Sequence, residues 1–218
     1  MKRFICAILI IFSVSATTFA DSADNDRSIS ILAIGNSFSV DAMQYLYDVL
    51  DKAGYEEIHL GNLYIGGCPL TRHADNLDGD KAAYAYYTND NGTWVKHPDF
   101  KASDALTSRK WDYISMQQAS GVSGQKESYE PWLTTVISYA KRLCPGATLM
   151  WHMTWAYDVD SSHKEFPKYN RDQMHMYRSI VDCVRTQVLP HSEISFVIPS
   201  GTTVQNLRTS LLSYGMTR

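Results

Sequence analysis

Four short polar segments carry the residue types of a hydrolytic site, and each follows an apolar run. They are residues 35–39 (GNSFS), 66–69 (GGCP), 117–121 (QQASG) and 152–157 (HMTWAY). In the first, Ser37 stands at a turn from strand to helix, where backbone N–H groups can stabilise the oxyanion that forms when a serine attacks an ester. Asn and Ser are also common as ordinary turn and capping residues, which is the alternative reading.

The other segments add groups that suit the same chemistry. Glycines 66 and 67 allow a backbone N–H to approach a ligand closely, and Gln118 carries an amide that can donate to a negative oxygen. The rings of residues 152–157, with Trp94 and its neighbouring tyrosines, suit a surface for a sugar or another flat substrate. Core packing is the competing use of each single ring.

Apolar runs and helical spacings alternate along the chain, which is typical of an α/β domain with a mostly parallel sheet. We expect a flavodoxin-like three-layer α/β/α sandwich with a five-stranded sheet. Asp90-Asn91-Gly92 is a hairpin turn signal and predicts an inserted β-hairpin over residues 82–97. The predicted strands are 29–34, 58–65, 111–116, 148–153 and 194–198, and the predicted helices are 40–53, one from about 131 to 143, 169–188 and 202–214.

These motifs resemble, in order, those of the SGNH (GDSL-type) hydrolases, which are serine esterases and lipases on a flavodoxin-like fold. GNSFS resembles their first block, and Gly66-Gly67-Cys68 resembles the second. The likeness is greatest to a secreted bacterial subgroup with a GNSFS block and a third-strand segment similar to residues 111–120, WDYISMQQAS. It spans nearly the whole chain after the N-terminal apolar run, including residues 198–201.

The resemblance implies that Ser37 is the nucleophile and that the backbone N–H groups of Ser37 and Gly67 form two parts of an oxyanion hole. The wider family supplies a third donor from an Asn, but no Asn occurs between Asn91 and Asn170. We therefore expect Gln118 to take that place. Asn36 replaces the commoner Asp before the nucleophile, as it does in the subgroup.

A serine hydroxyl needs a base to become a good nucleophile at neutral pH. The family carries its histidine in an Asp-x-x-His block near the C-terminus, and this sequence ends at Arg218, where that block is expected to begin. We expect a C-terminally incomplete domain. Two internal Asp-x-x-His matches end at His163 and His175. His163, in a loop after the fourth predicted strand, is the internal candidate, because His175 falls within a predicted helix.

The N-terminus has the pattern of a secretory signal peptide. Lys2 and Arg3 precede an apolar run over residues 4–14, which small residues follow. That run is too short to span a bilayer, which needs roughly 20 residues. We predict a signal peptide at 1–20 with cleavage near Ala20, a disordered leader at 21–27 and one domain at 28–218. The protein is then exported to the periplasm or the outside, and its mature part has no transmembrane segment.

Composition excludes several classes of protein. The 218 residues are 44% hydrophobic and 20% charged, which suits one domain with a sizeable core. The net charge is −3, without a basic cluster, so we expect no nucleic-acid partner. Cys68, Cys144 and Cys183 are too few for a disulfide framework, and we expect small buried groups. No Cys/His spacing suggests a metal, and we expect neither metal nor cofactor.

The sequence therefore predicts an exported SGNH-like serine esterase. It removes acetyl or similar acyl groups from carbohydrate through an acyl-enzyme on Ser37. Two alternatives stay open at this point. One is a catalytically inactive carbohydrate-binding module on the same fold, and the other is a truncated fragment.

Overall fold

The computed structural model describes residues 27–210 of the chain. The predicted signal peptide, nearly all of the predicted leader and residues 211–218 lie outside the described residues. Within the described part, no helix has the length and hydropathy needed to cross a membrane.

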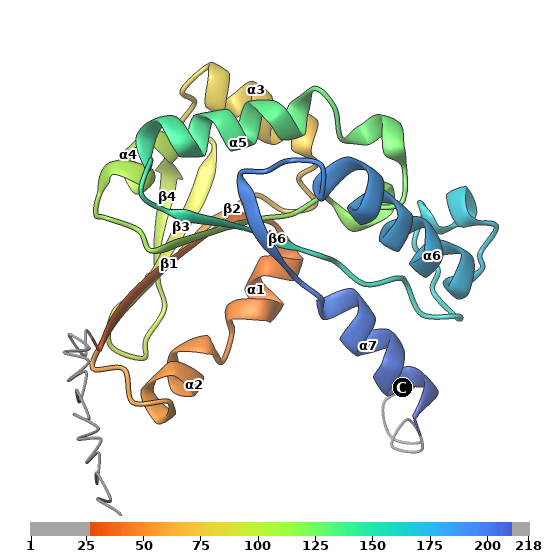
Figure 1. Cartoon of the computed structure of the whole chain (residues 1–218), viewed down its shortest axis with the longest axis horizontal. Coiled ribbons are helices and arrows are strands. Elements are labelled where there is room, and N and C mark those ends of the chain that lie inside the picture. The colour runs from red at the N-terminus through yellow and green to blue at the C-terminus, as the bar shows by residue number, and fades with distance from the viewer. Residues whose placement is uncertain (1–26, 211–218) are drawn as a thin grey trace, which may run out of the picture.

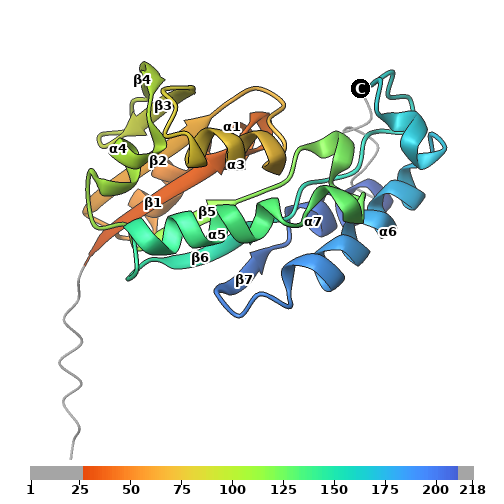
Figure 2. The same ribbon diagram turned by 90° about the horizontal axis from the view of Figure 1, so that it is seen from above.

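The described chain forms one seven-stranded sheet in the order β4-β3-β2-β1-β5-β6-β7 (Figures 1 and 2). Five neighbouring strands are parallel, as predicted. They are β1 (Ser28–Gly35), β2 (Glu57–Tyr64), β5 (Tyr113–Met116), β6 (Thr148–His152) and β7 (Ile194–Ile198). The predicted α/β fold class is therefore confirmed.

The number of strands differs from the prediction because the hairpin joins the sheet. Its strands, β3 (Tyr84–Asn89) and β4 (Val95–Phe100), extend the edge, where β3 pairs antiparallel with β2. Pairing with β2 satisfies the backbone groups that an edge strand leaves open. Gly92 in the turn has a φ of +85°, which suits the predicted hairpin turn.

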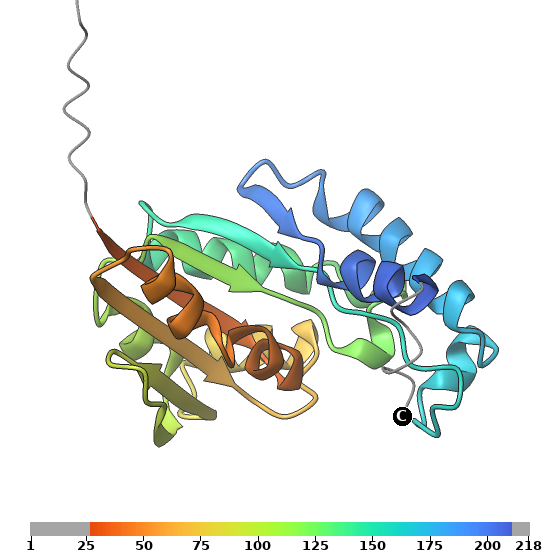
Figure 3. The ribbon, with the colours of Figure 1, turned by 90° about the horizontal axis from the view of Figure 1, so that it is seen from below.

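Helices cover both faces of the sheet and make three layers (Figures 2 and 3). One layer consists of α3 (Leu70–Asp78), α4 (Ala102–Thr107), α5 (Trp132–Leu143) and α6 (Gln173–Cys183). On the opposite side lie α1 (Ser37–Met43), α2 (Leu46–Lys52) and α7 (Ser200–Thr209).

Strand β1 shows why apolar residues occupy successive positions from Ile31 to Ile34. Leu32 and Ile34 belong to the larger core cluster, which contains side chains of α3, α5 and α6, whereas Ile29 and Ala33 belong to a smaller cluster with side chains of α1 and α2. A strand that is covered on both faces needs apolar residues at successive positions.

Several predicted helices have different limits in the structure. The predicted helix 40–53 is two helices, α1 and α2, which are separated at Gln44 and Tyr45. The predicted helix 169–188 comprises a 3-10 turn (Phe166–Tyr169), α6 and a π-helical turn (Val184–Val188).

Two helices, α3 and α4, were not predicted. Helix α3 buries polar side chains such as His73 and Asn76, which weakens its apolar pattern. Helix α4 has only six residues, too few for a clear helical period.

The cysteines of the described chain are small buried groups, as predicted. Cys68, Cys144 and Cys183 are buried, and each is a free thiol. No disulfide framework holds this part of the chain, so packing of the two core clusters must stabilise it.

Candidate functional site

The strand order brings the four polar segments to one edge of the sheet. Gly35 at the end of β1 pairs with Tyr64 at the end of β2, and Ile34 pairs with Met116 at the end of β5. Met116 pairs in turn with Trp151 of β6. The segments that follow these residues are therefore neighbours at the carboxyl edge of the parallel strands, where open α/β sheets bind ligands.

The first segment holds Ser37 at the start of α1. The preceding Asn36 caps this helix, because its Oδ1 accepts the N–H of Phe38 at 3.2 Å. The backbone carbonyl of Asn36 accepts the N–H of Ser39 at 3.0 Å. Ser37 itself is exposed, and no side-chain partner for its hydroxyl is found within residues 27–210. The turn thus presents a free hydroxyl to solvent at the sheet edge.

The Asn36 side chain joins this turn to the glycine segment after β2. It is 1% exposed, and its Nδ2 donates to the carbonyl oxygen of Cys68 at 3.1 Å. A carboxylate has no hydrogen to donate there, which gives a physical reason for Asn in place of Asp. The amide thereby brings the turn of Ser37 and the loop of Gly67 together.

Gly67 has a backbone conformation that leaves its N–H free to donate to a ligand. Its φ is +59°, a left-handed backbone conformation that glycine adopts easily. It is exposed, and its N–H has no backbone acceptor in the described chain. The N–H of Ser37 is also without a backbone acceptor there. Two free backbone donors therefore flank the Asn36 connection.

The structure gives Gln118 a different role from the predicted one. Its Nε2 donates to the carbonyl oxygen and the hydroxyl of Ser128, at 2.8 and 3.1 Å. Its Oε1 accepts the N–H groups of Leu70 and Ala119, at 3.0 and 2.8 Å. Both amide hydrogens are in use, so the expectation of a third oxyanion donor at Gln118 is corrected.

The neighbouring Gln117 connects to Asn36 instead. Its Nε2 donates to Asn36 Oδ1 at 2.7 Å, and its Oε1 lies 3.0 Å from Nδ1 of His152. An amide oxygen only accepts, so Nδ1 of His152 carries the hydrogen and Nε2 accepts the hydroxyl of Ser200 at 3.0 Å. A chain of hydrogen bonds thus runs from Ser200 through His152 and Gln117 to Asn36.

Burial keeps the imidazole of His152 neutral within this chain of hydrogen bonds. The residue is 2% exposed, and desolvation lowers the pKa of its imidazole to about 4. Ser200 reaches it because α7 packs closely on the sheet edge: a Cβ on Gly201 would lie 2.2 Å from the carbonyl oxygen of Thr154. His152 therefore fixes Gln117 and Asn36 in place. Gln117 and Ser200 lie in the segments 117–121 and 198–201 that stand out in the sequence, but their roles in this chain of hydrogen bonds were not predicted.

The internal histidine candidates differ in position. His163 is exposed and lines a cavity of about 430 Å³ together with Gly66, Gly67 and Ser120. Its Nδ1 accepts the N–H of Glu165 at 3.2 Å, and its ring packs on Tyr157 with centroids 4.4 Å apart. His163 thus lies at the same edge as the glycine loop.

His175 lies on α6, and the carboxylate of its Asp-x-x-His match serves another purpose. Asp172 caps α6, since its side chain accepts the backbone N–H of His175 at 2.8 Å. This match is explained by helix capping. Residues 27–210 contain no cluster of three or more His, Cys, Asp or Glu arranged to hold a metal ion.

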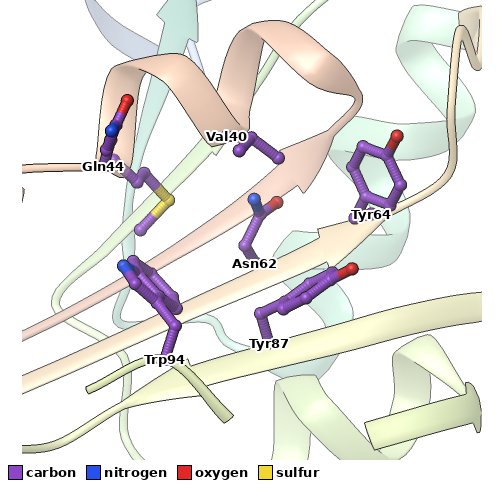
Figure 4. A pocket seen from close by; sticks show the side chains of 7 residues that line it. Val40, Gln44, Asn62, Tyr64, Tyr87 and Trp94 are labelled. Carbon is purple, nitrogen blue, oxygen red and sulfur yellow. The ribbon is translucent and has the colours of Figure 1, made fainter. Parts of the chain in front are cut away.

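A second cavity, of about 360 Å³, lies between α1 and the β3–β4 hairpin (Figure 4). Trp94 and Tyr87 of the hairpin region line it, as do Tyr64 and Asn62 of β2. The predicted aromatic residues of the hairpin therefore border a real cavity. Of the segment 152–157, Trp155 packs on Phe38, beside Ser37, with centroids 4.2 Å apart.

Comparisons with solved structures reveal a near relative as well as distant ones. The crystal structure of a DUF4886 family protein from Bacteroides uniformis ATCC 8492 is 41% identical, with a TM-score of 0.82 over 88% of this chain and 74% of that chain. Lipase Lip_vut3 from a goat rumen metagenome is 13% identical, with a TM-score of 0.47 over 88% and 90%. An extracellular lipase from Streptomyces rimosus is 10% identical, with a TM-score of 0.43 over 78% and 79%.

The two lipases do not bear on the chemistry of this chain at such low identity. No curated protein matches the sequence. The family model described as "Domain of unknown function (DUF4886)" matches residues 30–216, nearly the whole described chain. The chain therefore belongs to the DUF4886 family.

Proposed function

We propose that this protein is an exported serine esterase of the SGNH type that acts through an acyl-enzyme on Ser37. The observation that carries the proposal is the Asn36 amide, which links the exposed Ser37 to the loop of Gly67. This link joins the turn of Ser37 to the loop of Gly67, and the backbone N–H groups of both residues have no backbone acceptor in the described chain. Such donors stabilise the oxyanion of an acyl-transfer intermediate.

The reaction follows from these groups. The Oγ of Ser37 attacks the ester carbonyl carbon and passes its proton to a base, while the carbonyl oxygen takes hydrogen bonds from the N–H groups of Ser37 and Gly67. The C–O bond to the alcohol then breaks, and the alkoxide takes up the proton. Water attacks the acyl-enzyme in the same way and releases the carboxylic acid.

The base is the group that the experiments must assign. His163 is the candidate within the described residues, since it lines a cavity with Gly66 and Gly67. His152 does not suit the role, because it is 2% exposed and its Nε2 already accepts the hydroxyl of Ser200 at 3.0 Å, whereas His163 is exposed and its Nε2 has only a long contact, of 3.4 Å, with the Tyr157 hydroxyl. His163→Ala tests this candidate: a large loss of rate assigns the base to His163, and an unchanged rate excludes it.

The substrate that we propose is an acylated carbohydrate, with acetyl as the first acyl group to test. Export to the periplasm or the outside, as the N-terminal sequence pattern indicates, gives access to glycans. Aromatic rings favour the apolar faces of sugars, and Trp94 and Tyr87 border a cavity beside the helix that Ser37 begins.

The decisive experiment compares the purified protein with Ser37→Ala on p-nitrophenyl acetate and acetylated xylan. The matched control is Ser192→Ala, because Ser192 is exposed and precedes β7 at the opposite edge of the sheet. We expect Ser37→Ala to lose several orders of magnitude in rate and Ser192→Ala to keep the full rate. Equal rates for all three proteins would refute the esterase. Glycan binding without Ser37-dependent hydrolysis would favour the alternative of an inactive carbohydrate-binding module.

A further inference from the structure

We propose that the cavity between α1 and the β3–β4 hairpin is a subsite for a neutral sugar ring and that Asn62 selects its hydroxyl groups. The inference deepens the proposed function and rests on it for the reaction, but binding of the sugar can be tested without catalysis. The cavity is lined by Val40, Met43, Gln44, Asn62, Tyr64, Tyr87 and Trp94 (Figure 4).

The lining has the chemistry of a sugar site. Trp94, Tyr87 and Tyr64 supply aromatic rings, and the rings of Tyr64 and Tyr87 lie edge to face with centroids 5.9 Å apart. Val40 and Met43 of α1 form an apolar wall. Amide and phenol groups lie among these apolar surfaces. A pyranose presents the same combination of apolar C–H faces and polar hydroxyl edges.

Asn62 is the polar group that points to a ligand. It lies on β2 and is 2% exposed. The Ser39 hydroxyl donates to Asn62 Oδ1 at 2.9 Å, whereas Asn62 Nδ2 has no hydrogen-bond partner within residues 27–210. Asn62 lines the cavity, so the unpartnered end is available to an occupant.

This amide decides between a sugar and an apolar acyl chain. An alkyl chain has no hydrogen-bonding group, so it would displace water and leave the Asn62 amide unsatisfied, which is unfavourable. A sugar hydroxyl both donates and accepts, so it satisfies the amide in either orientation. Sites built to bond a hydroxyl group reject analogues that lack one.

The cavity also favours a neutral sugar over an acidic one. None of its seven lining residues is charged at neutral pH. The Lys96 ammonium lies near, 5.9 Å from the centroid of the Tyr87 ring, but it is not part of the lining. A buried carboxylate needs a cation or several donors to replace its hydration, and the lining provides no cation.

The cavity adjoins the proposed catalytic serine. Val40 follows Ser37 by one helical turn on α1. At the end of β2, Tyr64 pairs with Gly35, and its hydroxyl lies 3.2 Å from the position of a Cβ on Gly66. The cavity therefore ends beside the Gly66–Gly67 loop. A sugar in it would be the alcohol part of the ester, with the acylated hydroxyl toward Ser37.

The test measures binding to Ser37→Ala, which cannot form the acyl-enzyme. Xylohexaose, cellohexaose and mannohexaose at millimolar concentrations are the neutral probes, and oligogalacturonate and octanoate are the comparators. Calorimetry gives the affinities. We expect at least one neutral oligosaccharide to bind, and we expect Asn62→Leu or Trp94→Ala, added to Ser37→Ala, to weaken it by about tenfold or more.

Two controls separate binding from folding. Leu189→Ala should leave the affinity unchanged, because Leu189 is 59% exposed and does not line the cavity. If Asn62→Leu fails to fold, Asn62→Ala should also weaken binding, because it removes the amide that bonds the sugar hydroxyl and adds no bulk to the cavity.

Three results would overturn the subsite. The first is that no neutral oligosaccharide binds. The second is that oligogalacturonate binds more tightly than the neutral oligosaccharides. The third is that octanoate binds and that Asn62→Leu strengthens its binding. Ser37-dependent ester hydrolysis without sugar binding would reject this subsite and keep the esterase. Sugar binding without hydrolysis by the unmodified protein would keep the subsite and reject the esterase.

Discussion

The stability of the folded chain should fall in mild acid because His152 is buried and neutral. Desolvation lowers the pKa of its imidazole from 6.5 to about 4, whereas an unfolded chain has the ordinary value near 6.5. Between these values the unfolded state binds a proton that the native state does not bind. The contribution of His152 is therefore fully present above pH 6.5, is lost as the pH falls toward 4, and changes no further below that.

The size of the effect follows from the two pKa values. Each pH unit within this window costs about 1.4 kcal/mol in the free energy of unfolding. His152 thus accounts for a loss of about 2 kcal/mol at pH 5 and about 3 kcal/mol in total. His73 is also buried, and desolvation lowers its pKa to about 3, so it adds a loss of about 2 kcal/mol at pH 5.

The assay is urea unfolding at pH 7.5 and pH 5 for the unmodified protein and for His152→Gln. Glutamine does not titrate, so the variant should lose about 2 kcal/mol less than the unmodified protein between the two pH values. The comparison cancels the other titrating groups, including His73. His175→Gln is the matched control, because His175 is exposed on α6, and it should lose as much as the unmodified protein.

Equal losses for the unmodified protein and His152→Gln would refute this reasoning. His152 would then take up its proton equally in the folded and unfolded chains. The assignment of a neutral imidazole that accepts from Ser200 and donates to Gln117 would then also be wrong.

Three further results are expected. Asn36→Ala removes hydrogen bonds to three partners and should lower the free energy of unfolding by about 3 kcal/mol in urea titrations; a loss below about 1 kcal/mol would contradict the proposed link. Gly67→Ala should lower the free energy of unfolding by about 1 kcal/mol, because the φ of Gly67 is +59°. Gly146 also has space for a Cβ, and Gly146→Ala should lower the free energy of unfolding by less. Equal losses for the two variants would argue against the left-handed conformation of Gly67. The three buried thiols should resist Ellman's reagent until urea unfolds the chain, since burial raises the pKa of Cys68 and of Cys183 to about 12; fast native reaction would contradict their burial.

Much of the fold was predictable because its signals are local. The apolar run of β1, its Gly35 end and the helical spacing after it are readable within about 25 residues, and five such units imply a parallel sheet. The break between α1 and α2 was not predicted, because the apolar positions of 40–53 continue a helical period across it.

The candidate site was predictable only to the level of its segments. Gln117 and Gln118 are adjacent and chemically identical, yet Gln117 bonds to Asn36 and Gln118 bonds to Ser128 and the start of α3. Successive side chains after a strand point in opposite directions, so the direction depends on where the neighbouring elements lie. The sequence does not contain that information in local form.

The amino-acid pattern alone thus establishes the five parallel strands and their alternation with helices, the burial of the cysteines and the position of Ser37 at a strand-to-helix turn. These features depend on residue periodicity and on the conformational preferences of single residues. The partners of Asn36, the neutral state of His152 and the cavity that Asn62 lines depend on contacts between residues far apart in the chain. Such contacts exist only once the sheet has brought the ends of its strands together, and their hydrogen bonds and desolvation then set the chemistry of the site.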